Sequence, residues 1–399
     1  MQSVLHIVFG VVILHVLSDY RKRRKEFGVT RHTSLRPPGM AGGDVDGSER
    51  RIAVTVGEGL AVLVAHPGPL EDSETFERTA GGAEANVAAV LAQLGVETAW
   101  ISRVGDDGFG RYLVGNLAAQ GVDVSAVVTD PARATAVYVK ERGSGSGKAT
   151  DLAEQQSRML YYRTGSAASA LSAADLAAPA AAHLLDRCHL VHFSGITTAL
   201  SASATELTDA LIALPRRGRL VSFDLNYRPR LWAGRREQAA DVLARQVRGS
   251  DVVFIGTDEA GEVFGTDDPD RLRALFPEPG SLVIKDDANA VIGYEGAQRV
   301  SVPALRVEVA ERIGAGDAFA GGYLAALLHG RPLEQRLRYG HLCAAAALTG
   351  TGDAARLPAP EVLAALAAVD EKQWTSIDYA AAVTGGAVLS DPACDKAEI

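Results

Sequence analysis

Cysteine is scarce in this sequence, and its distribution excludes a disulfide-stapled fold. The chain of 399 residues contains three cysteines, Cys188, Cys343 and Cys394. Because their number is odd and they lie far apart, they cannot form a disulfide framework. We therefore expect a protein of the reducing cytoplasm.

Basic stripes and internal repeats are also lacking. The chain has 40 basic and 49 acidic residues and a formal net charge of −9. The sequence has no internal basic stripe of the kind that would indicate a nucleic-acid partner. Hydrophobic residues make up 47% of the chain, which is enough for a large core. The composition is that of a large globular protein.

An apolar run does occur at the N-terminus, from Val4 to Leu17, and the basic cluster Arg21 to Lys25 follows it. The run is shorter than the ~20 residues of a membrane-spanning helix. A signal peptide carries its positive charge before the apolar run, not after it. Three interpretations remain open: a short membrane anchor, an amphipathic docking segment, or non-native residues ahead of a true start at Met40. We favour the third, so a membrane partner is expected only if residues 1–25 are native.

From Arg51 onward, strand-like and helix-like stretches alternate. "AEANVAAVLAQLG" (83–95) has apolar residues at helical spacing and a closing Gly95. Later strand-like stretches include "CHLVHFSG", "RLVSFDLN", "DVVFIG" and "SLVIKD", with helical stretches between them. This alternation predicts an α/β fold with a mostly parallel central sheet and helices on both faces.

Residues 134–163 break the alternation. Two extended runs, "ATAVYVKER" and "RMLYYRTG", flank the loop "GSGSGK" and predict a β-hairpin. The loop is no phosphate-binding loop, because the full pattern requires glycine and Ser/Thr where Arg142 and Ala149 stand. We expect this hairpin and residues 60–80 to form a small β-sheet lid. The predicted division is an N-terminal extension (1–50), a main domain (51–370) with these lid segments, and a peripheral C-terminal tail (371–399).

The stretch "ERIGAGDAFAGG" (311–322) places Gly314, Ala315 and Gly316 directly before Asp317 at a predicted helix start. Such a start offers unpaired N–H groups and the positive end of the helix dipole. Glycines let an anion approach the backbone, and the acid can take a proton from a hydroxyl beside that anion. The alternative is that Asp317 is an ordinary acid in a first helical turn.

An earlier stretch, "GGAEANVAAVLAQLG" (81–95), places Gly81 and Gly82 before Asn86 at another helix start. The glycines allow backbone contact with a polar ligand, and the amide both donates and accepts hydrogen bonds. The two stretches together resemble the ribokinase-like (PfkB) carbohydrate kinases, whose signatures are an early GG-x-x-x-N helix and a late D-T-x-G-A-G-D helix. The resemblance covers about residues 52 to 368.

This resemblance implies a ribokinase-like fold in which the hairpin belongs to a β lid. It implies that Asp317 is the catalytic base and that the amides of Gly314, Ala315 and Gly316 form an anion hole. It also implies ATP and Mg²⁺ as cofactors, with a monovalent cation as an optional third. Lid strands that pair between subunits would give a homo-oligomer.

Three further stretches, "YYRTGSAASALS", "HFSGITTALS" and "FDLNYRPRLW", resemble 2-keto-3-deoxygluconate kinases. An arginine flanked by tyrosines suits the carboxylate of a sugar acid. Strand alternation places Tyr161 and Arg163 on one face, although a plain lid strand is the alternative. The resemblance implies these substrate-binding residues: Gly82, Asn86, Tyr138, Tyr161, Arg163, Arg228 and Asp353.

The nucleotide side departs from the family pattern. The late signature opens with Glu311-Arg312-Ile313 in place of Asp-Thr, which bears on any monovalent-cation site. The K-x-G-x-x-G loop reads "KDDANA" (285–290), so Asp287 and Ala290 replace glycines and two acids stand where phosphates pass, weakening ATP binding. The expected nucleotide-binding residues are Lys285, Asp287, Ala290, Gly314 and Gly316. In the magnesium motif, "GTDE", Glu259 remains as the metal-site residue while Gly256 replaces asparagine.

The sequence therefore predicts ATP-dependent phosphorylation of 2-keto-3-deoxygluconate at its terminal hydroxyl. One alternative is a related kinase for fructose, ribose or 2-keto-3-deoxygalactonate. Another is a sugar-acid-binding regulator without kinase activity, which the altered "KDDANA" loop favours.

Overall fold

The computed structural model describes residues 51–154, 156–350 and 355–383. The interpretations of residues 1–50 and the expected substrate residue Asp353 lie outside this part of the chain. Within these ranges, no helix combines the length and the apolar character needed to cross a membrane.

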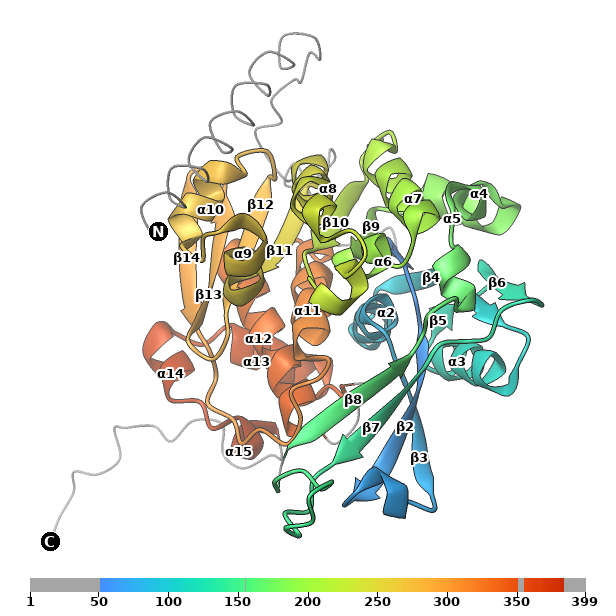
Figure 1. Ribbon diagram of the computed structural model, residues 1–399. Helices are drawn as coiled ribbons and strands as arrows, with labels where there is room; N and C mark the ends of the chain where they lie inside the picture. The colour runs from blue at the N-terminus through green and yellow to red at the C-terminus, as the bar shows by residue number, and fades with distance from the viewer. Residues whose placement is uncertain (1–50, 155, 351–354, 384–399) are drawn as a thin grey trace, which may run out of the picture. The chain divides into compact units, whose positions relative to one another are not determined.

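In the part of the chain that the structure describes, the main sheet has ten strands. Figure 1 shows how they are arranged. The strands from β12 to β5 run parallel, and β13 and β14 add an antiparallel edge. The strands, in their order across the sheet, are β14 (Gln298–Pro303), β13 (Ala290–Glu295), β12 (Ser281–Asp286), β11 (Val252–Gly256), β10 (Leu220–Asp224), β9 (Leu190–Ser194), β1 (Ile52–Val56), β4 (Glu97–Gly105) and β5 (Val122–Asp123), with β6 (Val127–Asp130) also paired to β4.

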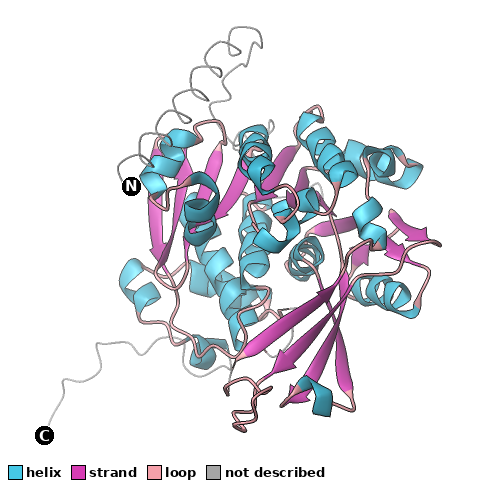
Figure 2. Cartoon of the chain, viewed as in Figure 1, coloured by secondary structure: helices cyan, strands magenta, loops and turns pink. Residues whose placement is uncertain are grey.

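Helices cover both faces of this sheet (Figure 2). In β11, Val252 and Phe254 join the core on one face, and Val253 and Ile255 join the core on the other. The first face packs against α2 (Ala83–Gln93), α11 (Ala315–Leu328), α12 (Leu333–Thr349) and α13 (Pro360–Ala367). The second packs against α4 (Ala173–Ala177), α5 (Pro179–Arg187), α7 (Ala202–Ala213), α8 (Arg236–Gly249), α9 (Thr257–Phe264) and α10 (Pro269–Leu275). The predicted α/β class is confirmed.

A second, four-stranded sheet forms the lid, in the order β3-β2-β7-β8. Its strands are β2 (Leu60–Pro67), β3 (Phe76–Gly81), β7 (Val137–Arg142) and β8 (Ser157–Tyr162). β7 and β8 pair antiparallel as a hairpin, and β2 joins β7 in parallel. The other helices before residue 370 are α3 (Gly108–Ala119), α6 (Gly195–Ala199) and the 3₁₀ helices Leu70–Asp72, Ala167–Ala170 and Pro229–Trp232.

The folded part continues past residue 370, where the sequence analysis placed a peripheral tail. Two short helices, α14 (Glu371–Thr375) and α15 (Tyr379–Val383), follow. Trp374 is 1% exposed, and its indole N–H donates to the carbonyl of Pro303. These helices are too short to show a clear period, yet they bury large aromatic side chains on the core.

Candidate functional site

The candidate site lies where the carboxyl ends of the parallel strands meet the lid and the start of α11. Parallel α/β sheets place ligands at this edge. Asp224 ends β10, Lys285 lies near the end of β12, and both line a cavity of about 1250 Å³. The lid residues Tyr138 and Tyr161 line the same cavity.

Asp317 lines this cavity at the start of α11. Helix α11 begins after Gly314, whose φ of 80° lies in the left-handed region that favours glycine. Asp317 follows in the first turn and accepts hydrogen bonds from the amides of Asn86, at 2.9 Å, and Asn226, at 3.4 Å. Burial raises its pKa to about 6, although the Asn86 hydrogen bond opposes the rise. The carboxylate therefore prevails at neutral pH and can act as a base.

A cation faces the start of α11. The ammonium of Lys285 lies 2.8 Å and 3.1 Å from the two carboxylate oxygens of Asp224. Burial alone would lower its pKa, but the charges of Asp224 and Glu259 keep it raised. A Cβ on Gly316 would stand 3.7 Å from this ammonium. The glycine thus leaves room for an anion between the helix N-terminus and the lysine.

Arg228 and Glu259 form a second charged pair at this edge, 2.8 Å apart. The other carboxylate oxygen of Glu259, Oε2, is buried and has no hydrogen-bond partner in the described structure. Burial raises the pKa of Glu259, and the Lys285 ammonium opposes the rise. This free oxygen fits a hydrated divalent cation.

The departures from the nucleotide pattern face one another. Asp287 lies in the turn between β12 and β13 with a φ of 38°, a backbone region that favours the glycine of the family pattern. Its carboxylate is 4.0 Å from the guanidinium of Arg312, and both side chains are exposed. Asp287 and Arg312 line the cavity, whereas Ala290 begins β13 and pairs with Asp286.

On the sugar side, Tyr138 and Tyr161 lie opposite each other across β7 and β8, with ring centroids 5.2 Å apart. Tyr138 is 3% exposed, and its hydroxyl has no hydrogen-bond partner within the described ranges. The guanidinium of Arg163 pairs with the buried carboxylate of Glu58, and its Nε has no hydrogen-bond partner there. The hydroxyl of Ser166 also donates to Glu58, at 2.6 Å.

Gly82 lines the cavity and has a packing role as well. Its φ is 128°, and a Cβ would lie 2.3 Å from the carbonyl oxygen of Glu58. Any side chain there would displace the backbone that carries Glu58. The close approach therefore requires glycine at this position, with or without a ligand.

Sequence reasoning missed three residues of the site: Glu58, Asp224 and Asn226. Asp224 ends a buried strand at the carboxyl edge, and Glu58 and Asn226 each lie two residues beyond the end of such a strand, which is the signal that would have found them. Asn226 also has a φ of 36°, a conformation that asparagine tolerates better than most residues.

Six buried polar atoms with no hydrogen-bond partner in the described chain belong to residues that line this cavity. Two of them, Glu58 Oε2 and Arg163 Nη2, form an ion pair with each other, and the other four are Tyr138 Oη, Arg163 Nε, Asn226 Oδ1 and Glu259 Oε2. Buried polar atoms are rarely left without a partner, so this group indicates a polar ligand.

Comparison with known proteins identifies one family and several relatives of this chain. Residues 55–360 match the model of the pfkB family of carbohydrate kinases. The 2-dehydro-3-deoxygluconokinase of Thermoproteus tenax is 34% identical over 313 residues, covering 77% of this chain and 91% of the relative. That of Bacillus subtilis (strain 168) is 31% identical over 322 residues, covering 78% and 94%. The structure of a PfkB protein from Polaromonas sp. JS666 has a TM-score of 0.68 and 32% identity, covering 80% of this chain and all of that one (100%).

Proposed function

Because the chain belongs to the pfkB family of carbohydrate kinases, we propose that it transfers a phosphoryl group from ATP to 2-keto-3-deoxygluconate, also called 2-dehydro-3-deoxygluconate. The product is the 6-phosphate. The observation that carries the proposal is the convergence of the base Asp317, the cation Lys285 and the unpartnered lid hydroxyl of Tyr138 on one cavity. The names of two relatives support the substrate.

The reacting hydroxyl of the sugar acid lies beside Asp317 in this proposal. The carboxylate takes the hydroxyl proton while the oxygen attacks the γ-phosphorus of ATP, and ADP leaves. The amides of Ala315 and Gly316, at the start of α11, and the ammonium of Lys285 stabilise the charge of the transferring group. Asn86 and Asn226 hold the carboxylate in place.

Tyr138, Tyr161 and Arg163 hold the sugar acid from the lid side. The hydroxyl of Tyr138 and the Nε of Arg163 are the free donors that a carboxylate or hydroxyl of the sugar would accept from. Binding energy at this end positions the reacting hydroxyl at the other end.

Glu259 would hold Mg²⁺ through its free carboxylate oxygen, and the ion would neutralise charge on the phosphates. Lys285, Gly314 and Gly316 would contact the phosphates of ATP. The use of ATP, together with the scarcity of cysteine, fits a cytoplasmic enzyme.

A neutral sugar such as fructose is the second candidate substrate. The observation that favours it is the ion pair between Arg163 and Glu58, whose side chains are 11% and 0% exposed. Since Glu58 already compensates the guanidinium charge, Arg163 would attract a substrate carboxylate less strongly than a free arginine would.

The test is ADP release by the full-length chain with ATP and Mg²⁺. The panel contains 2-keto-3-deoxygluconate, its galacto epimer, fructose and ribose. We expect turnover confined to the sugar acids. Asp317→Asn should lower kcat by about 10²–10⁴-fold while the fold is retained. Turnover of fructose or ribose alone would overturn the substrate, and near-normal turnover by Asp317→Asn would overturn the role of the base.

A further inference from the structure

Lys140 is a buried lysine of the lid that packs beside apolar side chains. It follows Tyr138 by two residues in β7, so the two side chains leave the strand on the same face. Lys140 pairs across the sheet with Val64 and Met159, which belong to or pack on the apolar cluster of the lid. It is 2% exposed. A buried ammonium in such surroundings requires a charged partner.

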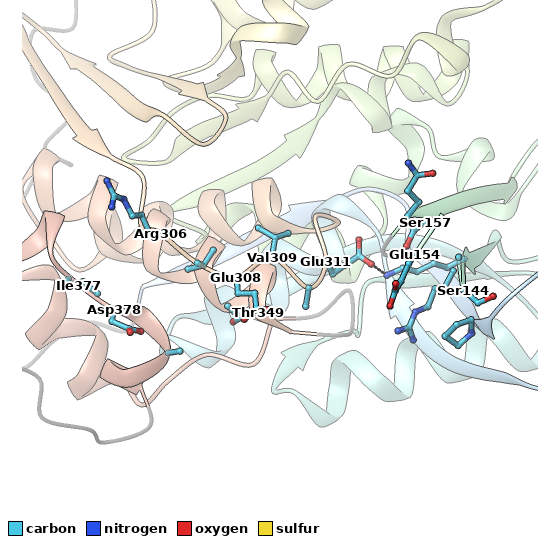
Figure 3. Close-up of a pocket in the computed structure, with 18 of the residues that line it drawn as sticks. Ser144, Glu154, Ser157, Arg306, Glu308, Val309, Glu311, Thr349, Ile377 and Asp378 are labelled. Atoms are coloured by element: carbon cyan, nitrogen blue, oxygen red, sulfur yellow. Dashed lines mark ion pairs between the residues drawn. The ribbon is translucent and has the colours of Figure 1, made fainter. Parts of the chain in front are cut away.

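That partner lies outside the lid. The ammonium pairs with Oε2 of Glu311, as the dashed line in Figure 3 marks. The other oxygen of Glu311, Oε1, accepts hydrogen bonds from the backbone amides of Arg312, at 2.9 Å, and Ile313, at 3.2 Å. One carboxylate therefore joins a lid strand to the turn that leads into α11.

This turn sets the position of the catalytic groups. Ile313 is followed by Gly314, the cap residue of α11, and Asp317 lies in the first turn of that helix. A shift of Glu311 would move the turn and, with it, the amides and the base. On the lid side, Tyr138 lies on the same strand as Lys140 and lines the cavity.

We propose that Lys140 and Glu311 are positioning residues that couple sugar binding at the lid to the geometry of the α11 turn. The proposal rests on the proposed kinase function. The proposal explains a role for Glu311, which stands where the family signature has the shorter aspartate. One oxygen of its carboxylate holds the turn while the other reaches the lid. Sugar that orders β7 through Tyr138 should thereby improve binding at the phosphate site.

The test measures this coupling by calorimetry on the full-length protein. The affinity for a non-hydrolysable ATP analogue with Mg²⁺ is compared with and without saturating 2-keto-3-deoxygluconate. In the wild-type protein the sugar acid should raise the affinity by about 5- to 150-fold, the usual range of coupling between two sites. In Lys140→Met and in Glu311→Gln we expect the ratio to fall to within about twofold of unity, and kcat to fall by about 10–100-fold.

Lys148→Met is the matched control. Lys148 is also a lid lysine, and its ammonium pairs with Asp72 at 2.6 Å, but both residues are exposed and belong to the lid segments. This variant should keep the wild-type coupling ratio and kcat. Thermal unfolding of each variant separates a loss of coupling from a loss of fold.

The double variant Lys140→Met/Glu311→Gln replaces a single variant that does not fold, because it leaves no unpaired buried charge. We expect it to be folded and uncoupled. Wild-type coupling in the folded single or double variants would overturn the proposal, as would a wild-type protein without coupling. Turnover of another sugar by the wild type would contradict only the assigned substrate, since the coupling can then be measured with that sugar.

Discussion

At the residue scale, the acidity of Asp317 sets the pH range of the reaction. Burial raises the pKa of this carboxyl to about 6, and the hydrogen bond from Asn86 opposes the rise. Only the carboxylate accepts the hydroxyl proton, so kcat/KM for the sugar should increase with pH through this pKa and level off above it. In Asn86→Ala the carboxylate loses a donor, so the apparent pKa should rise by about one unit.

The measurement is the pH dependence of kcat/KM for wild-type protein and variants between pH 5 and pH 9, a range chosen to bracket the pKa of about 6. Asn226→Ala is the control, because its amide is 3.4 Å from the other carboxylate oxygen and its loss should shift the pKa less. If the apparent pKa on the acidic side of the kcat/KM profile is the same in Asn86→Ala as in the wild type, this account of the base is wrong.

Single residues also show which features of the site could be predicted from the sequence. The start of α11 and its acid could be predicted because glycines, acid and apolar period are adjacent in the chain. The pairing of Arg163 with Glu58 could not, since it joins the end of the lid hairpin to the segment after β1. For the same reason the sequence predicted that Arg163 is unpaired and available to a substrate carboxylate, whereas in the structure it pairs with the buried carboxylate of Glu58.

At the scale of elements, the turn between β12 and β13 carries a strained acid at the entrance to the phosphate side. Asp287 has a φ of 38°, and its carboxylate lies 4.0 Å from Arg312. Asp287→Gly should relieve the backbone and remove a negative charge that repels ATP. We expect KM for ATP to fall by about 2–5-fold with kcat unchanged, a size typical of one exposed charge.

Steady-state kinetics with varied ATP, together with denaturant unfolding, checks this expectation. Arg217→Gly is the matched control, since Arg217 has a similar φ of 44° and an exposed side chain but pairs with Asp186 instead of facing the cavity. It should change stability without changing KM. An unchanged KM in Asp287→Gly would mean that the acid does not repel the nucleotide.

Elements with a local signal were predicted best. Gly95 was expected to end a helix, and it has the positive φ value, 78°, that helix ends favour. The short helices α14 and α15 have no such length or period. They hold together because Trp374 and Tyr379 are buried against the core, which is tertiary information.

At the scale of the whole molecule, the site draws on segments from both sheets and from α11, so its stability depends on groups that join them. Glu84 is one such group. It lies in α2, is 0% exposed, and accepts hydrogen bonds on one oxygen from the amide and hydroxyl of Ser194 and from the hydroxyl of Thr197. These bonds fasten α2, which carries Asn86, to the end of β9 and the start of α6.

The buried carboxyl of Glu84 should make folding depend on pH. Burial raises its pKa from 4.5 to about 7, against the opposing effect of the Ser194 and Thr197 hydrogen bonds. Because the folded pKa is the higher one, the stabilisation is complete below pH 4.5 and is lost as the pH rises through about 7. The loss amounts to about 3 kcal/mol of unfolding free energy. Glu84→Gln keeps the accepting oxygen but cannot ionise, so this part of the pH dependence should disappear.

Urea unfolding of full-length wild-type protein and Glu84→Gln, at one pH well below and one well above the range from 4.5 to 7, measures the difference. The exposed Glu97, at the start of β4, provides Glu97→Gln as the control for removing one charge. In Glu84→Gln the difference in unfolding free energy between the two pH values should be smaller than in the wild type by about 3 kcal/mol, and in Glu97→Gln it should be unchanged.

The same difference in unfolding free energy in Glu84→Gln and in the wild type would show that the carboxyl is ionised at little cost. The contacts between α2 and α6 would then have to hold a charged group, and Asp317 would feel a second negative charge nearby. Because that charge would raise the pKa of Asp317 further, the same experiment bears on the base as well as on the fold.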